Sequence, residues 1–521
     1  MGKNKLLLLP FFVGLVLMIY SWYLSYPLST SSVNDVAFNH ISILYWFSLP
    51  LLLASMFLMA MTTKNNFLKW ILSIGIVLTF FSLSYFYFFM PTADSQLFRG
   101  LTEYFISTKS LDPSQLNHGY YQWPAFFILA DVVTSISGLT LETYEFLLYT
   151  IIGFLLVTAL YVYGSKRYAN SGVLLVVAFF ISIAQLIDYQ AVPFSLGLTL
   201  LFLLFMLETR QRSVGLTLTL LVLYASLSIT HLFVPLFFVL YLFGRTLFDK
   251  NSQNRSHYSS LLLFALVSYL VIEITMARFS FGQLIKSFLK APSTYSGMVS
   301  SALAPSSVPN ITSVVAQFFS KTVTIAAILT CVAGLILLLV KRKTNALDKA
   351  ILLCGIVYSG LGVVLNTLGY RAIAVAFIPI SLGAAFLFKS KLRPYLTGFF
   401  LVLLVLCLFV PLHLSFNTGN SAQTRENYIA DNFFLNHYNW KNTDFFVTDF
   451  WTSTYLSPKM STYEYISTGL GTGEKPNAIL YTSQFEGLKL GNYSSMESLF
   501  QGERLNLEYN DGSSFVLIKP S

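Results

Sequence analysis

The chain has 521 residues, of which 55% are hydrophobic and only 11% are charged. Soluble domains carry roughly 25% charged residues, so this composition excludes a soluble globular protein and indicates an integral membrane protein. The net charge of +9 does not indicate a nucleic-acid-binding protein, because the Lys and Arg residues fall between apolar segments. We therefore expect the lipid bilayer, and no nucleic acid, among the partners.

Apolar runs of about 20 residues, which can cross a hydrocarbon core of roughly 30 Å, recur along the chain as far as residue 413. With the N-terminus in the cytoplasm, more than half of the 32 Lys and Arg residues fall in short cytoplasmic connections. This distribution predicts a multi-pass protein of the plasma membrane with an extracytoplasmic C-terminal segment. We predict about 13 spans, near 7–26, 42–62, 70–90, 144–164, 172–188, 194–207, 214–231, 233–248, 258–277, 322–340, 350–368, 372–388 and 395–413.

The predicted fold is an all-α polytopic transmembrane domain, 1–413, followed by a small extracytoplasmic α/β domain, 414–521. The last segment is rich in Asn, Thr, Tyr and Gly, and its runs DFFVTDFW, AILYTS and SFVLIKP favour strands. Two long outer loops are predicted, at 91–143 and 278–321. In the first, PAFFILADVVTSISG predicts a helix lying in the membrane interface, because a full span would place Lys166 and Arg167 outside.

Asp94 opens the first outer loop, directly after an apolar run. A carboxylate at the mouth of a transmembrane bundle is costly unless it has a function, so Asp94 is our candidate general base or metal ligand. The alternative is a helix N-cap, because Asp before SQLFRGLTEYF suits that position. Asp188 lies at the predicted outer end of another span, either as a second ligand of a divalent cation, Mg²⁺ or Mn²⁺, or as an ordinary interfacial acid.

Cationic residues and histidines on the same side are candidates for binding a donor phosphate. Arg371 opens a span after a short turn, which suits either a phosphate clamp or an arginine that bonds lipid headgroups. His231 lies in a very short connection between two spans, where a structural role is the commoner alternative. The remaining candidates are His118 in the first outer loop and Arg278, Lys286 and Lys290 in the second.

Glu103 and Asp112 are weaker candidates. Glu103 follows Arg99 by four residues, which predicts a surface helix pair. Glu273 is the clearest ionisable residue inside a predicted span, near its outer end. The sequence contains no P-loop, dinucleotide-binding glycine motif, metalloprotease motif or nucleophile elbow. We therefore expect any phosphate chemistry to involve a lipid-borne phosphate at the outer membrane surface.

Four features together resemble the GT-C glycosyltransferases, a superfamily that includes protein O-mannosyltransferases, aminoarabinose transferases and oligosaccharyltransferases. Asp94 follows a span at the start of the first large outer loop. The stretch YYQWPAFFILADVVTSISGLTLETYEFLLY is similar to the family's juxtamembrane helix and the span after it. The run IDYQAVPFSLGLTLLFLLF places Asp188 where many members carry a second acid. The basic loop 278–321 and Arg371 precede the last spans, and an outer domain follows.

The resemblance implies that Asp94 activates the acceptor or holds a metal ion, while Arg371 and nearby cations bind the donor phosphate. The expected reaction is inverting transfer of a sugar from polyprenyl or dolichyl phosphate to a lipid-linked glycan, a surface protein or a cell-wall polymer. The chain departs from the O-mannosyltransferase pattern where Ser95, and not Glu, follows Asp94, and it lacks the Trp-Trp-Asp signature of oligosaccharyltransferases. Transfer of one sugar is therefore expected over transfer of a whole glycan.

A transporter or flippase for lipid-linked sugars is the alternative function. It would share the outer vestibule and the cationic residues but would not need Asp94 as a base. Transporters often show repeated halves and charged residues near the middle of the membrane. Here the acids and cations gather at the predicted outer face, which favours surface chemistry and hence a membrane glycosyltransferase of the cell envelope.

Overall fold

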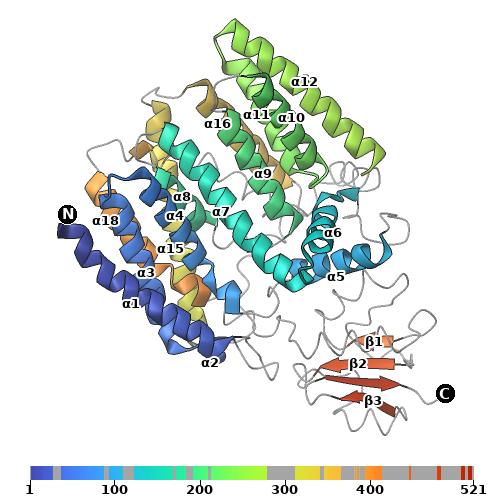
Figure 1. The fold of residues 1–521 in the computed structure, drawn as a ribbon. Helices are drawn as coiled ribbons and strands as arrows, with labels where there is room; N and C mark the ends of the chain where they lie inside the picture. The colour runs from blue at the N-terminus through green and yellow to red at the C-terminus, as the bar shows by residue number, and fades with distance from the viewer. Residues whose placement is uncertain are drawn as a thin grey trace.

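A computed structural model gives the structure of the chain, whose fold is shown in Figure 1. It describes residues 2–26, 37–86, 93–109, 122–167, 172–183, 192–208, 213–277, 311–340, 345–364, 381, 383, 386–387, 393–412, 445–447, 478–482, 506–510 and 514–518. Within these ranges, side chains are not described at 2–5, 37, 93–97, 167, 311–314 and 359–364, nor in the strands.

Helices that pack side by side make up most of the described chain (Figure 1). The first part contains α1 (Gly2–Ser25), α2 (Ala37–His40), α3 (Ile43–Thr62), α4 (Asn66–Phe80) and the 3₁₀ helix η1 (Ser82–Phe86). Next come α5 (Ala93–Thr108), α6 (Ala125–Ser137), α7 (Leu141–Arg167), α8 (Gly172–Ile183) and α9 (Pro193–Glu208). The remainder contains α10 (Val214–Ser228), α11 (Val234–Phe248), α12 (Ser252–Thr275), α15 (Ile311–Val340), α16 (Ala346–Val364) and α18 (Arg393–Leu406).

The length and composition of these helices identify a membrane-embedded protein. Six segments of the described chain are long and apolar enough to cross a bilayer, namely Leu6–Ser25, Ile43–Thr62, Leu141–Lys166, Ser252–Thr275, Val315–Val340 and Arg393–Leu412. Shorter apolar helices of 10–17 residues include α4, α8, α9, α10 and α11. Large apolar side chains are exposed along α1, α12 and α15, as expected for helices that face lipid. The total of about 13 spans stays a prediction.

Polar side chains mark where several of the helices begin. Oδ1 of Asn65 accepts hydrogen bonds from the backbone N–H groups of Phe67 and Leu68, at 2.9 and 3.3 Å. Ser213 and Asn251 cap α10 and α12 in the same way. Each cap satisfies backbone donors that the first turn of a helix leaves without a partner. The short polar connections between apolar runs therefore act as helix start signals.

The fourth helix differs from the predicted span at 70–90. It begins at Asn66 and ends at Phe80, where the tighter helix η1 continues the chain. The aromatic run that follows Phe80 has the hydropathy of a span. However, the Ser82 hydroxyl donates a hydrogen bond to the Thr79 carbonyl at 2.7 Å, which offers the backbone an alternative to regular helix. Hydropathy therefore places this helix correctly but misplaces both of its ends.

Two helices of the second half approach each other closely. A Cβ atom added to Gly244 of α11 would lie 2.8 Å from the Cα atom of Ala350 in α16, so this crossing requires a glycine. Further along the same contact, the hydroxyl of Tyr358 donates a hydrogen bond to the backbone carbonyl of Phe233. The close approach and the hydrogen bond together fix α16 along the length of α11.

The described part of the C-terminal segment is a sheet of β1 (Phe445–Val447), β2 (Ala478–Thr482), β3 (Asn506–Asn510) and β4 (Ser514–Ile518). Its strand order is β1-β2-β4-β3, with β1 and β2 parallel and the other pairs antiparallel. Strands β1, β2 and β4 coincide with the runs predicted to form strands, whereas β3 does not. Figure 1 places the sheet beyond the end of the helices at which α5 lies. The domain boundary at 413 and the helices of an α/β domain stay predictions.

Candidate functional site at the α5 end of the bundle

The two ends of the helical bundle carry different segments (Figure 1). At one end lie α5, α6, the turn between α10 and α11, and the C-terminal end of α12; we call this the α5 end. At the opposite end lies the connection between α11 and α12; we call this the Arg245 end, after the residue at its centre. In the predicted orientation, the α5 end faces outward and the Arg245 end faces the cytoplasm.

Asp94, the predicted catalytic acid, is the second residue of α5. It therefore lies in the first helical turn and not at the N-cap position that precedes the helix. A carboxylate in the first turn of a helix is stabilised by the helix macrodipole. The side chain of Asp94 lies outside the described part of the structure, and its role as a base or metal ligand stays a prediction.

Arg99, further along α5, binds three carboxylates. Its guanidinium contacts Glu103 at 3.1 Å, and Glu142 and Glu145 at the start of α7 at 2.6 and 3.4 Å. Only 2% of the Arg99 side chain is exposed, so the predicted surface pair with Glu103 is wrong: the pair forms, but inside the protein. A buried charge is retained only with such partners, because desolvation is costly. This cluster fixes α5, including the backbone of Asp94, against α7.

The sixth helix packs on α5 through aromatic rings. The ring centroid of Phe98 lies 6.2 Å from that of Phe126 and 6.4 Å from that of Phe127. At the far end of α5, the ammonium group of Lys109 pairs with the carboxylate of Asp131. These ring contacts and a terminal ion pair hold the two helices together, so α5 and α6 form one packed unit.

A second face of α6 exposes the apolar side chains of Ile128, Leu129, Val132 and Ile136. Asp131 lies beside this stripe. The hydrogen bond from Lys109 lowers the pKa of the Asp131 carboxyl, and this outweighs the opposite effect of burial. A short helix with an apolar stripe and an ionised flank matches the predicted interfacial helix. The helix is confirmed; its depth in the membrane stays a prediction.

Trp123 leads the chain into α6 and contacts a buried acid. Its indole N–H donates a hydrogen bond to Oε1 of Glu273, near the end of α12, at 3.2 Å. The Glu273 side chain is fully buried, and its Oε2 has no hydrogen-bond partner among the described residues. Leu232 and Ala277 pack around Trp123. A buried carboxyl with one unpaired oxygen, inside a membrane helix, indicates a functional position.

His231 lies in the turn between α10 and α11, next to Leu232. Its Nδ1 accepts a hydrogen bond from the backbone N–H of Phe233 at 3.1 Å, and its ring packs edge-to-face on Phe194 with centroids 5.4 Å apart. Only 6% of the residue is exposed. These contacts are those of a structural histidine, the commoner of the two alternatives. Phosphate binding by His231 stays a prediction.

Most of the other predicted site residues lie outside the described residues. These are Asp188, Arg371, His118, Arg278, Lys286 and Lys290. Among the side chains that the structure describes, no three His, Cys, Asp or Glu residues form a group that could hold a metal ion. The Mg²⁺ or Mn²⁺ site proposed for Asp94 and Asp188 stays a prediction.

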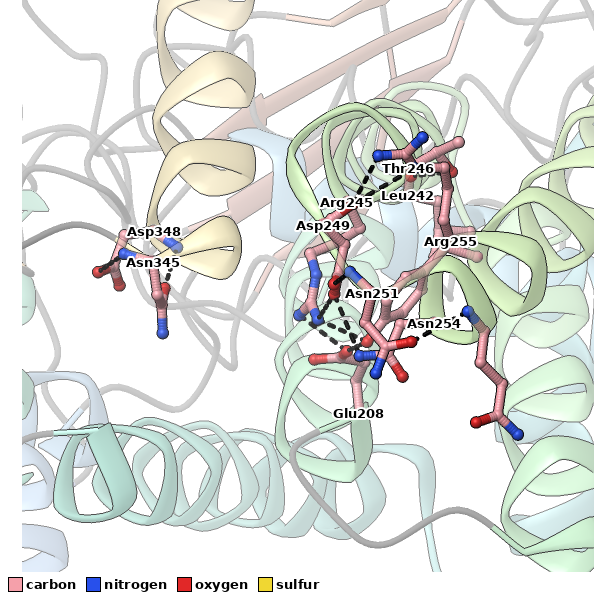
Figure 2. A network of polar contacts seen from close by, with 12 residues as sticks. Glu208, Leu242, Arg245, Thr246, Asp249, Asn251, Asn254, Arg255, Asn345 and Asp348 are labelled. Atoms are coloured by element: carbon pink, nitrogen blue, oxygen red, sulfur yellow. Dashed lines mark hydrogen bonds and ion pairs between the residues drawn. The ribbon is translucent and has the colours of Figure 1, made fainter.

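A polar network joins α9, α11 and α12 at the Arg245 end (Figure 2). The guanidinium of Arg245 contacts the carboxylates of Glu208 at 2.9 Å and Asp249 at 3.3 Å. The hydroxyl of Tyr258 accepts a hydrogen bond from Arg245 at 2.6 Å and donates one to Glu208, and Tyr241 donates another to Glu208 at 2.7 Å. Nε of Arg245 has no partner among the described residues. Glu208 of α9 and Arg245 of α11 thus form a buried ion pair, to which Tyr258 of α12 is hydrogen-bonded.

Asp249 extends this network into the connection between α11 and α12. Its Oδ1 accepts a hydrogen bond from the backbone N–H of Asn251 at 3.0 Å, and its backbone carbonyl accepts one from Arg255 at 3.1 Å. Burial raises the pKa of the Asp249 carboxyl, but the hydrogen bonds from Asn251 and Arg245 outweigh it and lower the pKa. The acid therefore stays ionised opposite its cation, as a structural ion pair does.

The α5 end thus brings together an acid in the first turn of α5 and the buried contact between Trp123 and Glu273. Sequence reasoning singled out Glu273 as ionisable but gave no sign of its contact with Trp123. Comparisons with protein-family models and with curated proteins found no match to this chain.

Proposed function

We propose that the chain is an inverting glycosyltransferase that moves one sugar from a polyprenyl- or dolichyl-phosphate donor to an acceptor outside the cytoplasm. The observation that carries the proposal is the gathering of α5, Trp123 and Glu273 at one end of the bundle, opposite the Arg245 network. A reaction of a lipid-borne donor takes place where the phosphate meets water. Acids placed at that depth support such chemistry.

Asp94 is the general base in this proposal. It takes the proton of an acceptor hydroxyl while that oxygen forms a bond to the anomeric carbon of the donor. The bond from the anomeric carbon to the phosphate oxygen breaks with its electron pair, and polyprenyl phosphate leaves. Arg371 stabilises the departing phosphate, assisted by Arg278, Lys286 and Lys290. Orientation of the acceptor, proton transfer to Asp94 and stabilisation of the charge on the phosphate each lower the barrier to sugar transfer, and no covalent intermediate is needed.

The acceptor is a lipid-linked glycan, a surface protein or a cell-wall polymer. The β-sheet lies beyond the α5 end (Figure 1), and in this proposal it holds the acceptor. Asp188 assists either by sharing a divalent cation with Asp94 or by orienting the acceptor. A chelator separates these roles, because it stops transfer only if the cation takes part.

The first test compares wild type and Asp94→Asn in membranes supplied with radiolabelled polyprenyl-phosphate sugars. Loss of a general base is expected to lower transfer of label into lipid- or protein-bound product by about 10²- to 10⁴-fold. Ser95→Ala, one residue further along the same helix, is the matched control and keeps wild-type transfer. Full activity in Asp94→Asn would show that Asp94 is not the base.

A transporter or flippase for lipid-linked sugars is the second candidate function. The observation that favours it is Glu273, a buried carboxyl near the end of a span, because transporters use such groups to bind protons or cations. Label that crosses the membrane without entering any product, and that stops crossing in Glu273→Gln, would replace the enzyme by this alternative.

A further inference from the structure

The entry to α6 is joined to the second half of the bundle by two hydrogen bonds. The indole N–H of Trp123 donates to Oε1 of Glu273 at 3.2 Å, and the backbone N–H of Ala125 donates to the carbonyl of Ile229 at 3.1 Å. Glu273 belongs to α12, and Ile229 follows α10 directly. Both contacts therefore cross from α6 to helices that lie more than a hundred residues further along the chain.

The same helix supports α5. Phe98 packs on Phe126 and Phe127, and Lys109 pairs with Asp131. Since the α5–α6 unit is held together in this way, a shift of α6 relative to α12 moves α5 as well. The Arg99 cluster ties α5 to α7. Among the described residues, the hydrogen bond between the side chains of Trp123 and Glu273 thus joins the α5–α6 unit to α12.

The hydrogen bond between Trp123 and Glu273 is shielded from water. Trp123 is 6% exposed and Glu273 is 0% exposed, so no bulk water competes for the hydrogen bond. Removing either partner would leave the other with a buried polar atom and no partner, which is costly. The contact requires an acceptor oxygen at the Oε1 position and a donor at Nε1, and it requires neither a charge nor the free Oε2.

We propose that the Trp123–Glu273 hydrogen bond is a positioning contact that sets the α5–α6 unit, and with it Asp94, against the end of α12. Glu273 is then a positioning residue that acts through its Oε1 acceptor. The contact exists whatever the reaction is, whereas its effect on turnover rests on the proposed function. Loss of the contact displaces the base from the acceptor and leaves the donor phosphate site in place.

Three substitutions separate this role from a role for the charge. Glu273→Gln keeps an acceptor oxygen for the indole N–H, Glu273→Leu removes it, and Trp123→Phe removes the donor but keeps an aromatic ring. We expect Glu273→Leu and Trp123→Phe to lower kcat by about 10- to 100-fold, as a small misplacement of a catalytic group does. The KM for the donor stays within about twofold, because donor binding is unchanged. Glu273→Gln is expected to restore kcat to the wild-type range.

A double-mutant cycle tests whether the two residues act as a pair. The double variant Glu273→Leu/Trp123→Phe is expected to lower kcat no further than either single substitution, since one lost contact cannot be lost twice. If the decrease in kcat of the double variant equalled the product of the two single decreases, the residues would act separately. Loss of activity in Glu273→Gln with a normal Trp123→Phe would assign the role to the charge or to Oε2 and overturn the proposal.

A distance measurement tests the contact without any assay of activity. Spin labels on Ile136→Cys and Ile274→Cys report the distance between α6 and α12, because Ile136 is 82% exposed and Ile274 is 55% exposed. Singly labelled variants control for labelling of the buried native cysteines. Wild type and Glu273→Gln should share one narrow distribution, which broadens or shifts in Glu273→Leu and Trp123→Phe. An unchanged distribution in both disrupted variants overturns the contact, whereas absent glycosyl transfer in wild type overturns only the proposed function.

Discussion

Glu208 at the Arg245 end and Glu273 at the α5 end are two buried acids with opposite surroundings. At the Arg245 end, Glu208 contacts a guanidinium and two tyrosine hydroxyls. At the α5 end, Glu273 has one hydrogen bond and, within the described part of the chain, no ion pair. A satisfied buried ion pair costs much to break, whereas an incompletely paired acid is retained where function requires it. The comparison indicates a structural role for the Arg245 network, whereas chemistry at the α5 end is our proposal.

Arg245→Ala gives the largest expected effect and tests the structural end. It leaves Glu208 and Asp249 buried without their cation, which lowers the free energy of unfolding by about 3–5 kcal/mol. Arg255→Ala is the control, since among the described residues the Arg255 side chain donates to the backbone carbonyl of Asp249, and it should cost about 1 kcal/mol. Unfolding in detergent measures both variants. Equal losses in the two would show that the network does not depend on Arg245.

Arg99→Lys tests the Arg99 cluster at the α5 end. Like the Arg245 network, this cluster pairs a buried guanidinium with several carboxylates. Lysine keeps the positive charge but cannot reach Glu103, Glu142 and Glu145 with separate guanidinium nitrogens. We expect a loss of about 1.5–3 kcal/mol in the free energy of unfolding, the value of a charged hydrogen bond. An unchanged stability would mean that a point charge is sufficient to join α5 to α7.

Glu273→Gln sharpens the comparison directly. Glutamine still accepts the indole hydrogen bond of Trp123 and removes a buried carboxyl, so stability should change by less than about 1 kcal/mol. The same change at Glu208 removes a charged acceptor from Arg245 and two hydroxyls, and it should cost about 1.5–3 kcal/mol. The two variants belong in one unfolding experiment. If they cost the same, the two ends do not differ in how they use buried acids.

Asp131→Asn has the smallest expected effect. The pKa of Asp131 in the folded chain is lowered from its ordinary value of 3.8, so its ion pair stabilises the fold above that value. The advantage over Asp131→Asn is at most about 1 kcal/mol at pH 7, because Lys109 is largely exposed. It disappears as the pH falls through the lowered pKa. Unfolding of both proteins between pH 7 and acid pH measures it, and a constant difference would contradict the ion pair.

Much of the helical fold could be predicted because the signals are local. The predicted span at 42–62 coincides with α3, and the amphipathic run after Pro124 is α6. The end of α4 could not be predicted, since its aromatic continuation has span-like hydropathy and only the Ser82 hydrogen bond marks the change. Strand β3 has a polar sequence, and its pairing with β4 decides its conformation.

The contacts of the candidate site could be predicted less well from the sequence than the helices. The position of Asp94 after a span is visible locally, and so is an ionisable Glu273 inside a span. The contact of Glu273 with Trp123 joins residues 150 positions apart, and no pattern along the chain indicates it. The contacts of Arg99 with another helix could not be predicted from local spacing either. Its spacing to Glu103 predicts a surface pair, but Glu142 and Glu145 come from another helix and make the site buried.

The strand order β1-β2-β4-β3 has a consequence for how the protein is made. β4 is the last of these strands to leave the ribosome, yet it lies between β2 and β3 and pairs with both. Until β4 has been made, β3 lacks the strand that pairs with it, so the sheet cannot be completed in the order in which its strands emerge. Premature termination between Asn510 and Ser514 would therefore remove β4 from the centre of the sheet and leave β3 without the strand that pairs with it. Such a truncated chain would carry an unpaired segment, and not a slightly smaller sheet.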